Sequence, residues 1–382
     1  MCNLLTIFNK GNTANYSQYF SDESRRFGFA DSISFPKNIA EVETILHTMR
    51  VAGIPVTVQG ARTGLDGAAV PTGGHILNCI KMDSVGSLRS SEDGSFFLTV
   101  GSGTSISSIA NFLHNENATL FWPPAPTEPS ATVGGVIASK ARGIYTSKYG
   151  EASSWVSRIE KVDEVITSAE IILLSIPQSV WGIAFVFPSL EKACTFILET
   201  DRLHNNTIAA LELVNKTALD CISDLKKHAA RLHTLPNTSG HEALVYAELH
   251  SENDSISEET AAVIMKIAES CGSDLDLSWA LSGSEEVERI RIICHAAQEA
   301  ALASHDHRLS GKALGLELML SPNAAFSTLN SYLTRFTADG IDAAVFGSLT
   351  GGRLRICPLP RNNANYENAV RLLSEWKGVL SI

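Results

Sequence analysis

The chain has 382 residues and a formal net charge of −11, from 30 Lys and Arg against 41 Asp and Glu. This length predicts two domains, because a single hydrophobic core rarely grows so large. An apolar fraction of 44% excludes a disordered or fibrous chain. The acidic balance argues against nucleic acid as a main partner.

The seven cysteines are scattered, so they indicate neither a disulfide framework nor a zinc pattern. No apolar run has the length of a transmembrane segment. The first residues also lack the basic and apolar regions of a secretory signal. We therefore expect a cytoplasmic protein.

The first part of the chain alternates short strands and helices. Residues 1–30 are polar and irregular, and apolar residues spaced along one helical face then predict a helix over 39–52, ended by Gly53. The further elements expected here are strands over 55–59, 75–80 and 96–100 and a helix over 104–115.

A different pattern follows Pro177, in which longer helices alternate with half-buried strands. The expected strands cover 181–187, 208–213, 243–249, 315–320, 342–348 and 353–359. The expected helices cover 189–204, 216–228, 258–271, 285–303, 324–338 and 366–376. This pattern predicts a sheet with helices packed on one face. The expected fold is α+β, with domains over 20–176 and 180–382.

A glycine-rich loop follows the strand at 55–59. Gly60, Gly64 and Gly67 permit positive φ and let the backbone approach another group closely. Inward-facing N–H groups of such a loop can hold a phosphate. The order of the glycines matches neither a Walker loop nor the Rossmann GxGxxG pattern. A plain surface turn is the alternative interpretation.

A second segment of small residues covers 129–139 and contains a Gly-Gly pair. Its small side chains would let a flat cofactor pack against the chain, whereas the alternative is a tight helix start in the core. Two such segments in one domain favour a cofactor site over either alternative alone.

These residues carry a family resemblance. The runs at 35–78, 98–113 and 122–150, including VTVQGARTGLDGAAVPTGG and PSATVGGVIASKARG, resemble the FAD-binding domain of the vanillyl-alcohol oxidase and p-cresol methylhydroxylase (PCMH) type. The branch is that of FAD-linked D-lactate dehydrogenases and glycolate oxidases. The resemblance is thinner over 181–378, where AALELVNKTAL and DAAVFGSLTGGRLRICPLP are similar to a shortened substrate domain with an antiparallel sheet.

The resemblance implies non-covalent FAD and two groups of residues that bind it. The group along the pyrophosphate is Gln59, Gly60, Ala61, Arg62, Thr63, Gly64 and Leu65. The group along the flavin and ribityl chain is Pro124, Thr127, Ser130, Ala131, Thr132, Gly134, Gly135, Ala138 and Gly143.

The chain departs from the family at places that serve the cofactor and the substrate. Relatives carry a long segment after the position of Val162, and here only Asp163 and Glu164 precede VITSAEIILL, so we expect weakened FAD binding. Relatives also continue beyond the equivalent of Ile382 into a Glu-His-Gly segment.

The substrate residues of the family are replaced too. Ser348 and Arg355 stand where relatives have two metal-binding histidines, so we expect no metal site. Cys294 stands in place of the arginine that would clamp a substrate carboxylate.

The replacements themselves suggest weak catalytic candidates. Alternation along 353–359 places Arg353, Arg355 and Cys357 on one face, so two guanidinium groups could bind an acidic substrate. A solvated face is the competing interpretation. His295 could act as a base, although a satisfied core histidine is the simpler interpretation.

The resemblance implies an oxidoreductase that moves a hydride from a small 2-hydroxy acid, such as D-lactate or glycolate, to the flavin. Its partners would be a small carboxylate and an electron acceptor, either a quinone, a cytochrome or oxygen, and a homo-oligomer stays open. The departures support an alternative, a catalytically impaired flavin-binding or apo protein that acts as a subunit or interaction module. A third interpretation is an incomplete or internally deleted product of a full enzyme.

Overall fold

The structure is a computed structural model that describes residues 5–8, 13–24, 26–64, 67–124, 128–227, 238, 240–305, 309, 314–320 and 324–379. The chain divides into two compact units, of which unit 1 comprises residues 1–143 and 151–176 and unit 2 comprises 144–150 and 177–382. Residues 144–150, which the sequence pattern assigns to the first domain, thus belong to unit 2.

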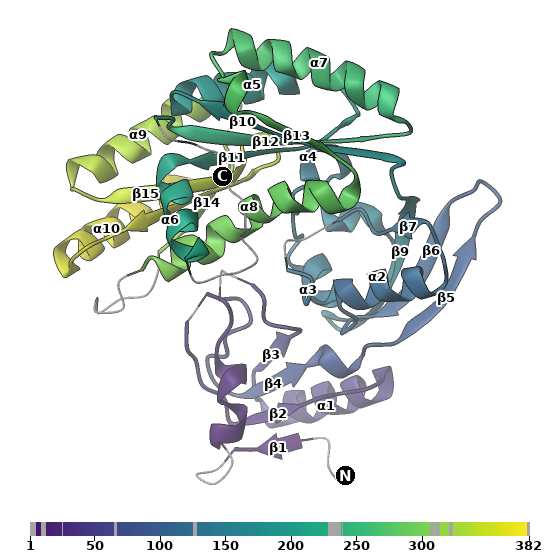
Figure 1. Cartoon of the computed structure of the whole chain (residues 1–382). Helices are drawn as coiled ribbons and strands as arrows, with labels where there is room; N and C mark the ends of the chain where they lie inside the picture. The colour runs from purple at the N-terminus through teal and green to yellow at the C-terminus, as the bar shows by residue number, and fades with distance from the viewer. Residues whose placement is uncertain are drawn as a thin grey trace. The chain divides into compact units, whose positions relative to one another are not determined.

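Unit 1 contains two sheets (Figure 1). The first has the order β1-β2-β4-β3, with β1 antiparallel to β2 and the other pairs parallel. Its strands are β1 (Leu5–Ile7), β2 (Ser32–Ser34), β3 (Val56–Gln59) and β4 (His75–Asn78). The start of the chain therefore contains a strand that its polar, irregular sequence does not indicate.

Helix α1 (Ile39–Ala52) has the bounds that its sequence predicts because both ends carry their own signals. The Asn38 side chain accepts a hydrogen bond from the Glu41 backbone N–H, which caps the first turn. Gly53 ends the helix in the left-handed conformation, with φ of 64°.

The second sheet of unit 1 is antiparallel and has the order β5-β6-β9-β7, with β8 also paired to β9. Its strands are β5 (Val85–Ser90), β6 (Phe96–Gly101), β7 (Leu120–Phe121), β8 (Val156–Val162) and β9 (Val165–Ser175). The helices of this part are α2 (Ile106–Asn115) and α3 (Val133–Ala138). Short 3-10 turns in unit 1 are η1 (Thr13–Phe20), η2 (Cys79–Lys81) and η3 (Ala152–Trp155).

Strands β8 and β9 form a hairpin at the place where relatives are expected to carry a longer segment. Val162 pairs directly with Val165, so Asp163 and Glu164 make a two-residue turn. Asp163 has a φ of 52°, which suits the tight turns that join antiparallel strands. The short junction is therefore closed by antiparallel pairing, with a register shift between Glu160 and Lys161.

Unit 2 is built on a seven-stranded antiparallel sheet of order β13-β10-β12-β11-β15-β16-β14. The strands are β10 (Ser179–Phe187), β11 (Ile208–Asn215), β12 (Ala243–Ser251), β13 (Trp279–Ser282), β14 (Leu316–Leu318), β15 (Asp342–Ser348) and β16 (Arg353–Leu359). The helices are α4 (Thr146–Tyr149), α5 (Leu190–Asp201), α6 (Lys216–Lys226), α7 (Asp254–Ser270), α8 (Ser284–Ala303), α9 (Ala325–Ala338) and α10 (Asn363–Val379), with the 3-10 turn η4 (Leu275–Leu277).

Helices cover both faces of this sheet, so the prediction of helices on one face is wrong (Figure 1). Apolar residues of α5, α7, α9 and α10 share one core with alternate residues of the strands. On the opposite face, α8 approaches β10 so closely that a Cβ on Gly182 would lie 3.0 Å from Val287 Cγ1. The α+β class with an antiparallel sheet in the second part is confirmed.

Candidate functional site

The first predicted cofactor segment leaves the end of strand β3 in unit 1. The buried Gln59 side chain donates from Nε2 to the carbonyl oxygens of Tyr19 (2.8 Å) and Ala69 (2.7 Å). Its Oε1 accepts from Asn78 Nδ2 at 3.2 Å. Both Nε2 hydrogens therefore bond carbonyl groups of the protein itself. Through these bonds the Gln59 side chain holds the loop in place.

The backbone that follows Gln59 has a conformation suited to binding an anion. Arg62 is left-handed, with φ of 63°, and its carbonyl oxygen accepts from the Glu23 N–H at 3.2 Å. Within the described part of the chain, the N–H groups of residues 61–64 donate no hydrogen bond. Free N–H groups in a left-handed turn are the means by which such loops hold phosphates.

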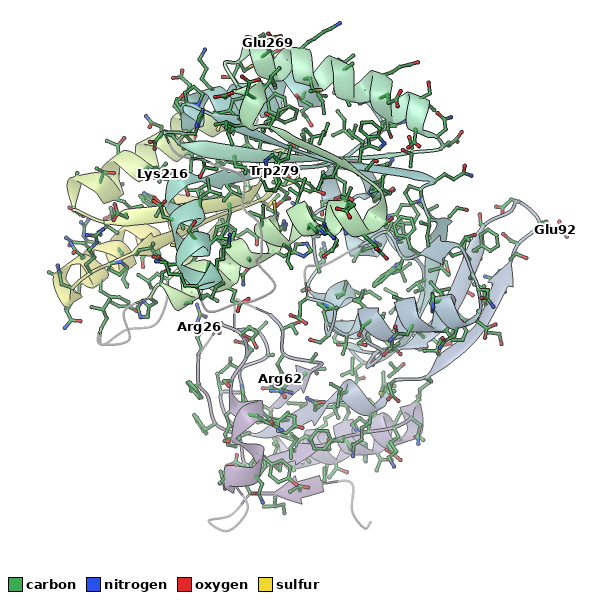
Figure 2. All side chains as sticks on the ribbon, viewed as in Figure 1. Arg26, Arg62, Glu92, Lys216, Glu269 and Trp279 are labelled. Carbon is green, nitrogen blue, oxygen red and sulfur yellow. The ribbon has the colours of Figure 1, made fainter. Side chains whose placement is uncertain are left out.

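Arg62, which is labelled in Figure 2, also brings a positive charge to the loop. Its guanidinium lies over the Tyr19 ring, 4.5 Å from the centroid. Burial lowers the pKa of Arg62 from its usual value, and the neighbouring Tyr19 and Glu23 partly offset this. The half-buried cation stays fully charged at neutral pH and suits a pyrophosphate.

The second predicted segment packs against the loop that follows β6. The Val133 N–H donates to the Thr104 carbonyl (2.9 Å), and the Gly134 N–H donates to the Ser102 carbonyl (2.8 Å). A Cβ on Gly134 would lie 2.8 Å from Ser102 Cβ, which explains the glycine there. The exposed Ser130 hydroxyl donates to Glu128 at 2.6 Å.

The two segments meet at Gly60 and Thr132. A Cβ on Gly60 would lie only 2.1 Å from Thr132 Oγ1, so no side chain fits there. Thr132 is 3% exposed, and its hydroxyl has no hydrogen-bond partner. An unpaired buried hydroxyl beside free N–H groups fits a cofactor rich in oxygen atoms. The residues present therefore fit FAD in unit 1.

The remaining predicted FAD residues differ in accessibility. Ala131, Pro124 and Gly143 are buried, whereas Gly135 and Ala138 are exposed on α3. Ala61 and Thr63 are half-buried and Gly64 is exposed in the first loop. Leu65 and Thr127 lie outside the described residues. The roles of these residues in binding stay predictions.

In unit 2, a polar row crosses three neighbouring strands on the face that carries α6 and α8. Leu213 pairs with Gly347 and Ser348 pairs with Arg353, which aligns Glu212 of β11 with Ser348 of β15 and Arg353 of β16. Arg353 Nη2 donates to Glu212 Oε2 at 2.8 Å. Glu212 is 2% exposed, and burial raises the pKa of its carboxyl although Arg353 opposes this.

The predicted alternation of β16 is confirmed, since Leu354 and Ile356 lie in the core while Arg353 and Arg355 face the other side. Both arginines have carboxylate partners. Arg355 lies 3.8 Å from Glu317 of β14, in parallel with the contact between Arg353 and Glu212. The two guanidinium groups are thus charge-compensated, and substrate binding by them stays a prediction.

His295 lies in α8 and is half-buried. Its Nε2 is buried and has no hydrogen-bond partner in the described part of the chain, so His295 is not satisfied there as a core histidine, and the alternative of an interface histidine stays a prediction. Burial lowers the pKa of His295 to about 4, and the positive charges of Arg291 and Arg353 add to this effect. The imidazole is therefore neutral at physiological pH.

A buried carboxylate network lies near this row and was not predicted from the sequence. Glu248 of β12 accepts from Arg291 Nε (2.9 Å) and Nη2 (2.7 Å), and from Tyr145 Oη (2.8 Å). It also contacts His250 Nε2 at 2.8 Å and the Tyr246 hydroxyl. Burial by itself raises the pKa of Glu248, but the hydrogen bonds and charges of His250 and Arg291 outweigh it and lower the pKa to about 2.

The signal that finds Glu212 and Glu248 is the same in both strands. Each is a single acidic residue inside an apolar run, IAALELVN and ALVYAELH. A carboxylate in such a strand is retained only where a partner compensates its burial. Among the described residues, no three His, Cys, Asp or Glu side chains are grouped so that they could hold a metal ion.

The fold and the cradle around Gly60 and Thr132 define a cofactor-binding protein, and comparison with known proteins identifies the cofactor. Residues 30–165, which lie in unit 1 except for 144–150, match the FAD binding domain family, and this match supports FAD as the cofactor. The sequence is 30% identical over 220 residues to a D-lactate dehydrogenase of Archaeoglobus fulgidus, which covers 48% of this chain and 47% of the relative. It is 26% identical over 155 residues to a D-2-hydroxyglutarate dehydrogenase of Xanthomonas citri pv. viticola, covering 40% of this chain and 32% of the relative.

Solved structures extend the likeness in fold to both units. An alkyldihydroxyacetonephosphate synthase superposes with a TM-score of 0.72 at 15% identity, over 98% of this chain and 76% of the other. A p-cresol methylhydroxylase structure with bound substrate gives a TM-score of 0.71 at 12% identity, over 98% and 83%. The PCMH-type fold is thereby confirmed.

The chain spans about half the length, or less, of the curated relatives that it matches. Within the residues that the structure describes, none of the helices has both the length and the apolar character of a membrane span.

Proposed function

We propose that the protein is an oxidoreductase with non-covalent FAD that oxidises a small 2-hydroxy acid of the D-lactate or glycolate kind. The observation that carries this proposal is the cradle of unit 1, where the free N–H groups of residues 61–64 and the unpaired Thr132 hydroxyl fit the cofactor. The substrate class is supported by the relatives, which are named D-lactate and D-2-hydroxyglutarate dehydrogenases.

The polar residues of unit 2 are proposed to bind the substrate. Arg353 keeps an unpaired Nε–H beside its bond to Glu212 and would attract the substrate carboxylate together with Arg355. His295 is neutral and its Nε2 is unpaired, which makes it a candidate for the proton acceptor, but a pKa lowered to about 4 makes this imidazole a weak base. When FAD is bound, it supplies the hydride acceptor.

A second candidate is a flavin-binding subunit or interaction module without this catalysis. The observation that favours it is charge compensation, because Glu212 and Glu317 already pair with the two arginines. An anionic substrate would have to compete with these carboxylates.

The visible spectrum of the FAD-loaded protein separates the two candidates. D-lactate, glycolate and D-2-hydroxyglutarate are added in turn without oxygen. Bleaching of the flavin bands supports the oxidoreductase, whereas bands that persist with all three acids favour the subunit. If the protein takes up no FAD on reconstitution, both the oxidoreductase and the flavin-binding subunit are contradicted.

The electron acceptor is proposed to be a quinone, a cytochrome or oxygen, and the location to be the cytoplasm. The location is supported by the cysteines, since the six in the described part of the chain are all free thiols. Reoxidation of the bleached flavin by air, by a soluble quinone or by a cytochrome identifies the acceptor.

A further inference from the structure

The polar row of unit 2 contains two polar atoms that the ion pair between Glu212 and Arg353 does not satisfy. Glu212 Oε1 and Arg353 Nε are both buried and have no hydrogen-bond partner, although the two side chains bond each other through their other atoms. Buried polar atoms without partners cost about 1–3 kcal/mol each, so natural proteins rarely keep them without a reason.

Two more unpaired polar atoms belong to neighbouring parts of unit 2. Thr350 Oγ1 is buried in the turn between β15 and β16, three residues before Arg353. His295 Nε2 comes from α8, and the charge of Arg353 affects the pKa of this imidazole, so the two lie within electrostatic reach. Thr350 therefore lies close to Arg353 along the chain, and His295 lies within reach of the charge of Arg353.

The second ion pair on the same sheet face, Glu317 with Arg355, lacks such unpaired atoms. Glu317 and Arg355 face each other across β14 and β16 in the same manner. Neither of them has a buried atom without a partner, and Glu317 is 48% exposed. Water therefore reaches the Glu317 carboxylate, whereas Glu212 is buried beside an Arg353 side chain that is still 19% exposed.

The unpaired atoms are complementary to one kind of ligand. A carboxylate oxygen accepts hydrogen bonds, and a guanidinium Nε–H donates one. Because Glu212 and Arg353 are in direct contact, a small ligand can satisfy both with a hydroxyl donor next to an acceptor oxygen. A 2-hydroxy acid has these two groups on adjacent carbons.

We propose that Glu212 and Arg353 form a hydroxyl-recognition subsite, in which Glu212 Oε1 accepts from the substrate hydroxyl and Arg353 Nε–H donates to the adjacent oxygen. Glu212 is then a residue that determines specificity for hydroxylated acids. This inference deepens the proposed function and rests on it for the identity of the ligand as substrate.

The test measures binding of two probes to the FAD-loaded protein by calorimetry. The first is 2-hydroxy-2-methylpropanoate, whose carbinol carbon has no hydrogen and therefore cannot be oxidised. The second is 2-methylpropanoate, which lacks the hydroxyl. We expect the hydroxylated probe to bind about tenfold more tightly, because the probe without the hydroxyl leaves Glu212 Oε1 unpaired in the complex.

In the Glu212→Gln variant the preference for the hydroxylated probe should fall to about twofold or less. Both acids can bind this variant more tightly because a negative charge is removed, so the ratio of the two constants is the readout. Glu317→Gln removes the same charge from the other pair and should keep the wild-type ratio. Arg353→Lys keeps the charge beside Glu212 but removes Nε–H, and both probes should then bind more weakly.

An equal affinity of the wild-type protein for the two probes, or no binding of either, overturns the inference without any variant. A wild-type preference that survives in Glu212→Gln overturns the role of Glu212. Flavin bleaching by D-lactate with no hydroxyl preference leaves the proposed function standing while the subsite fails. A hydroxyl preference without bleaching by any of the three acids supports the subsite and overturns the proposed oxidation.

Discussion

At the scale of single residues, the Thr132 hydroxyl connects the stability of the protein with its cofactor. This hydroxyl is buried without a partner, and it lies beside Gly60 of the first cofactor loop. Thr132→Val should therefore raise the free energy of unfolding of the FAD-free protein by about 1 kcal/mol. The same change should weaken FAD binding about fivefold, because a hydrogen bond to the cofactor is lost.

Thr200→Val is the matched control for this prediction. Thr200 is a second buried threonine whose Oγ1 has no partner, but it lies in α5 of unit 2. Its replacement should stabilise the FAD-free protein to a similar extent and leave the FAD dissociation constant unchanged. Equal effects of both variants on FAD binding would contradict the placement of Thr132 in the cradle. Chemical denaturation and flavin titration provide the two readings.

Gly60 provides a second prediction at the same scale. A methyl group on Gly60 would meet Thr132 Oγ1 at 2.1 Å, so Gly60→Ala forces the two loops apart. Such overpacking costs about 1–3 kcal/mol and displaces the cradle, so purified protein should contain little flavin. Flavin absorbance per polypeptide is the measurement.

Gly94→Ala controls for lost stability alone. Gly94 has a φ of 83° and open space around it, in the hairpin of β5 and β6 whose tip Glu92 marks in Figure 2. An alanine there is strained by roughly 1 kcal/mol through its backbone. It should keep its full flavin content, and a loss as large as that of Gly60→Ala would mean that general destabilisation explains both.

Residue-level prediction from the sequence worked unevenly. The resemblance names Gly60 and Thr132 as expected FAD-binding residues. Their contact across the two loops follows only from the fold. Glu212 lies within the AALELVNKTAL motif, but the sequence does not single it out, because its partner Arg353 lies far along the chain and on a strand that is not adjacent. Nothing local in an apolar strand indicates that its one carboxylate is paired.

At the scale of elements, the Glu248 network ties α4, β12 and α8 together within unit 2. Arg291 holds the Glu248 carboxylate with two nitrogens, and the carboxylate is fully buried. Arg291→Met leaves that buried charge without its cation and should lower the free energy of unfolding by about 3–5 kcal/mol. Denaturant unfolding followed by circular dichroism measures the change.

Two further variants test the cause of that loss. Arg289→Met removes the exposed ion pair with Glu286 on the same helix and should change stability by less than about 0.5 kcal/mol. Adding Glu248→Gln to Arg291→Met should restore part of the stability, because the charge itself is removed. A double variant as unstable as Arg291→Met would show that lost packing, not the unpaired charge, dominates.

Elements with signals of their own were predicted well, and those that depend on distant partners were not. Helix α1 and strands β15 and β16 have the predicted bounds, since caps and alternation are local. The second helical layer was missed although β10 and β12 are buried along nearly their whole length. Such continuous burial indicates a sheet covered on both faces. The β8–β9 hairpin was missed because its turn falls where a longer segment was expected.

At the scale of the whole molecule, each unit contains a histidine whose surroundings resist its protonation. His75 is fully buried between Ser32 Oγ and Ser34 Oγ in unit 1, and burial lowers its pKa to about 4. Burial likewise lowers the pKa of His295 in unit 2 to about 4. Both units therefore share one source of acid sensitivity.

The sign of the effect follows from the two states of each histidine. Below pH 6.5 the unfolded chain binds a proton at each site, whereas the folded chain does so only near pH 4. Stability is therefore complete above pH 6.5 and falls as the pH drops toward 4, by about 2 kcal/mol for each histidine between pH 7 and pH 5. Glu248 acts in a lower window, between its usual value of 4.5 and about 2.

His295→Gln tests this account of acid sensitivity in unit 2. The variant has no proton to take up, so its unfolding free energy should lose about 2 kcal/mol less than wild type between pH 7 and pH 5. The loss below pH 4 should stay as in wild type, because Glu248 and its partners are unchanged. Urea unfolding at pH 7, 5, 4 and 3 gives the values to compare. An unchanged slope between pH 7 and pH 5 would mean that the pKa of His295 in the folded protein is close to its usual value of 6.5, so burial would not lower it.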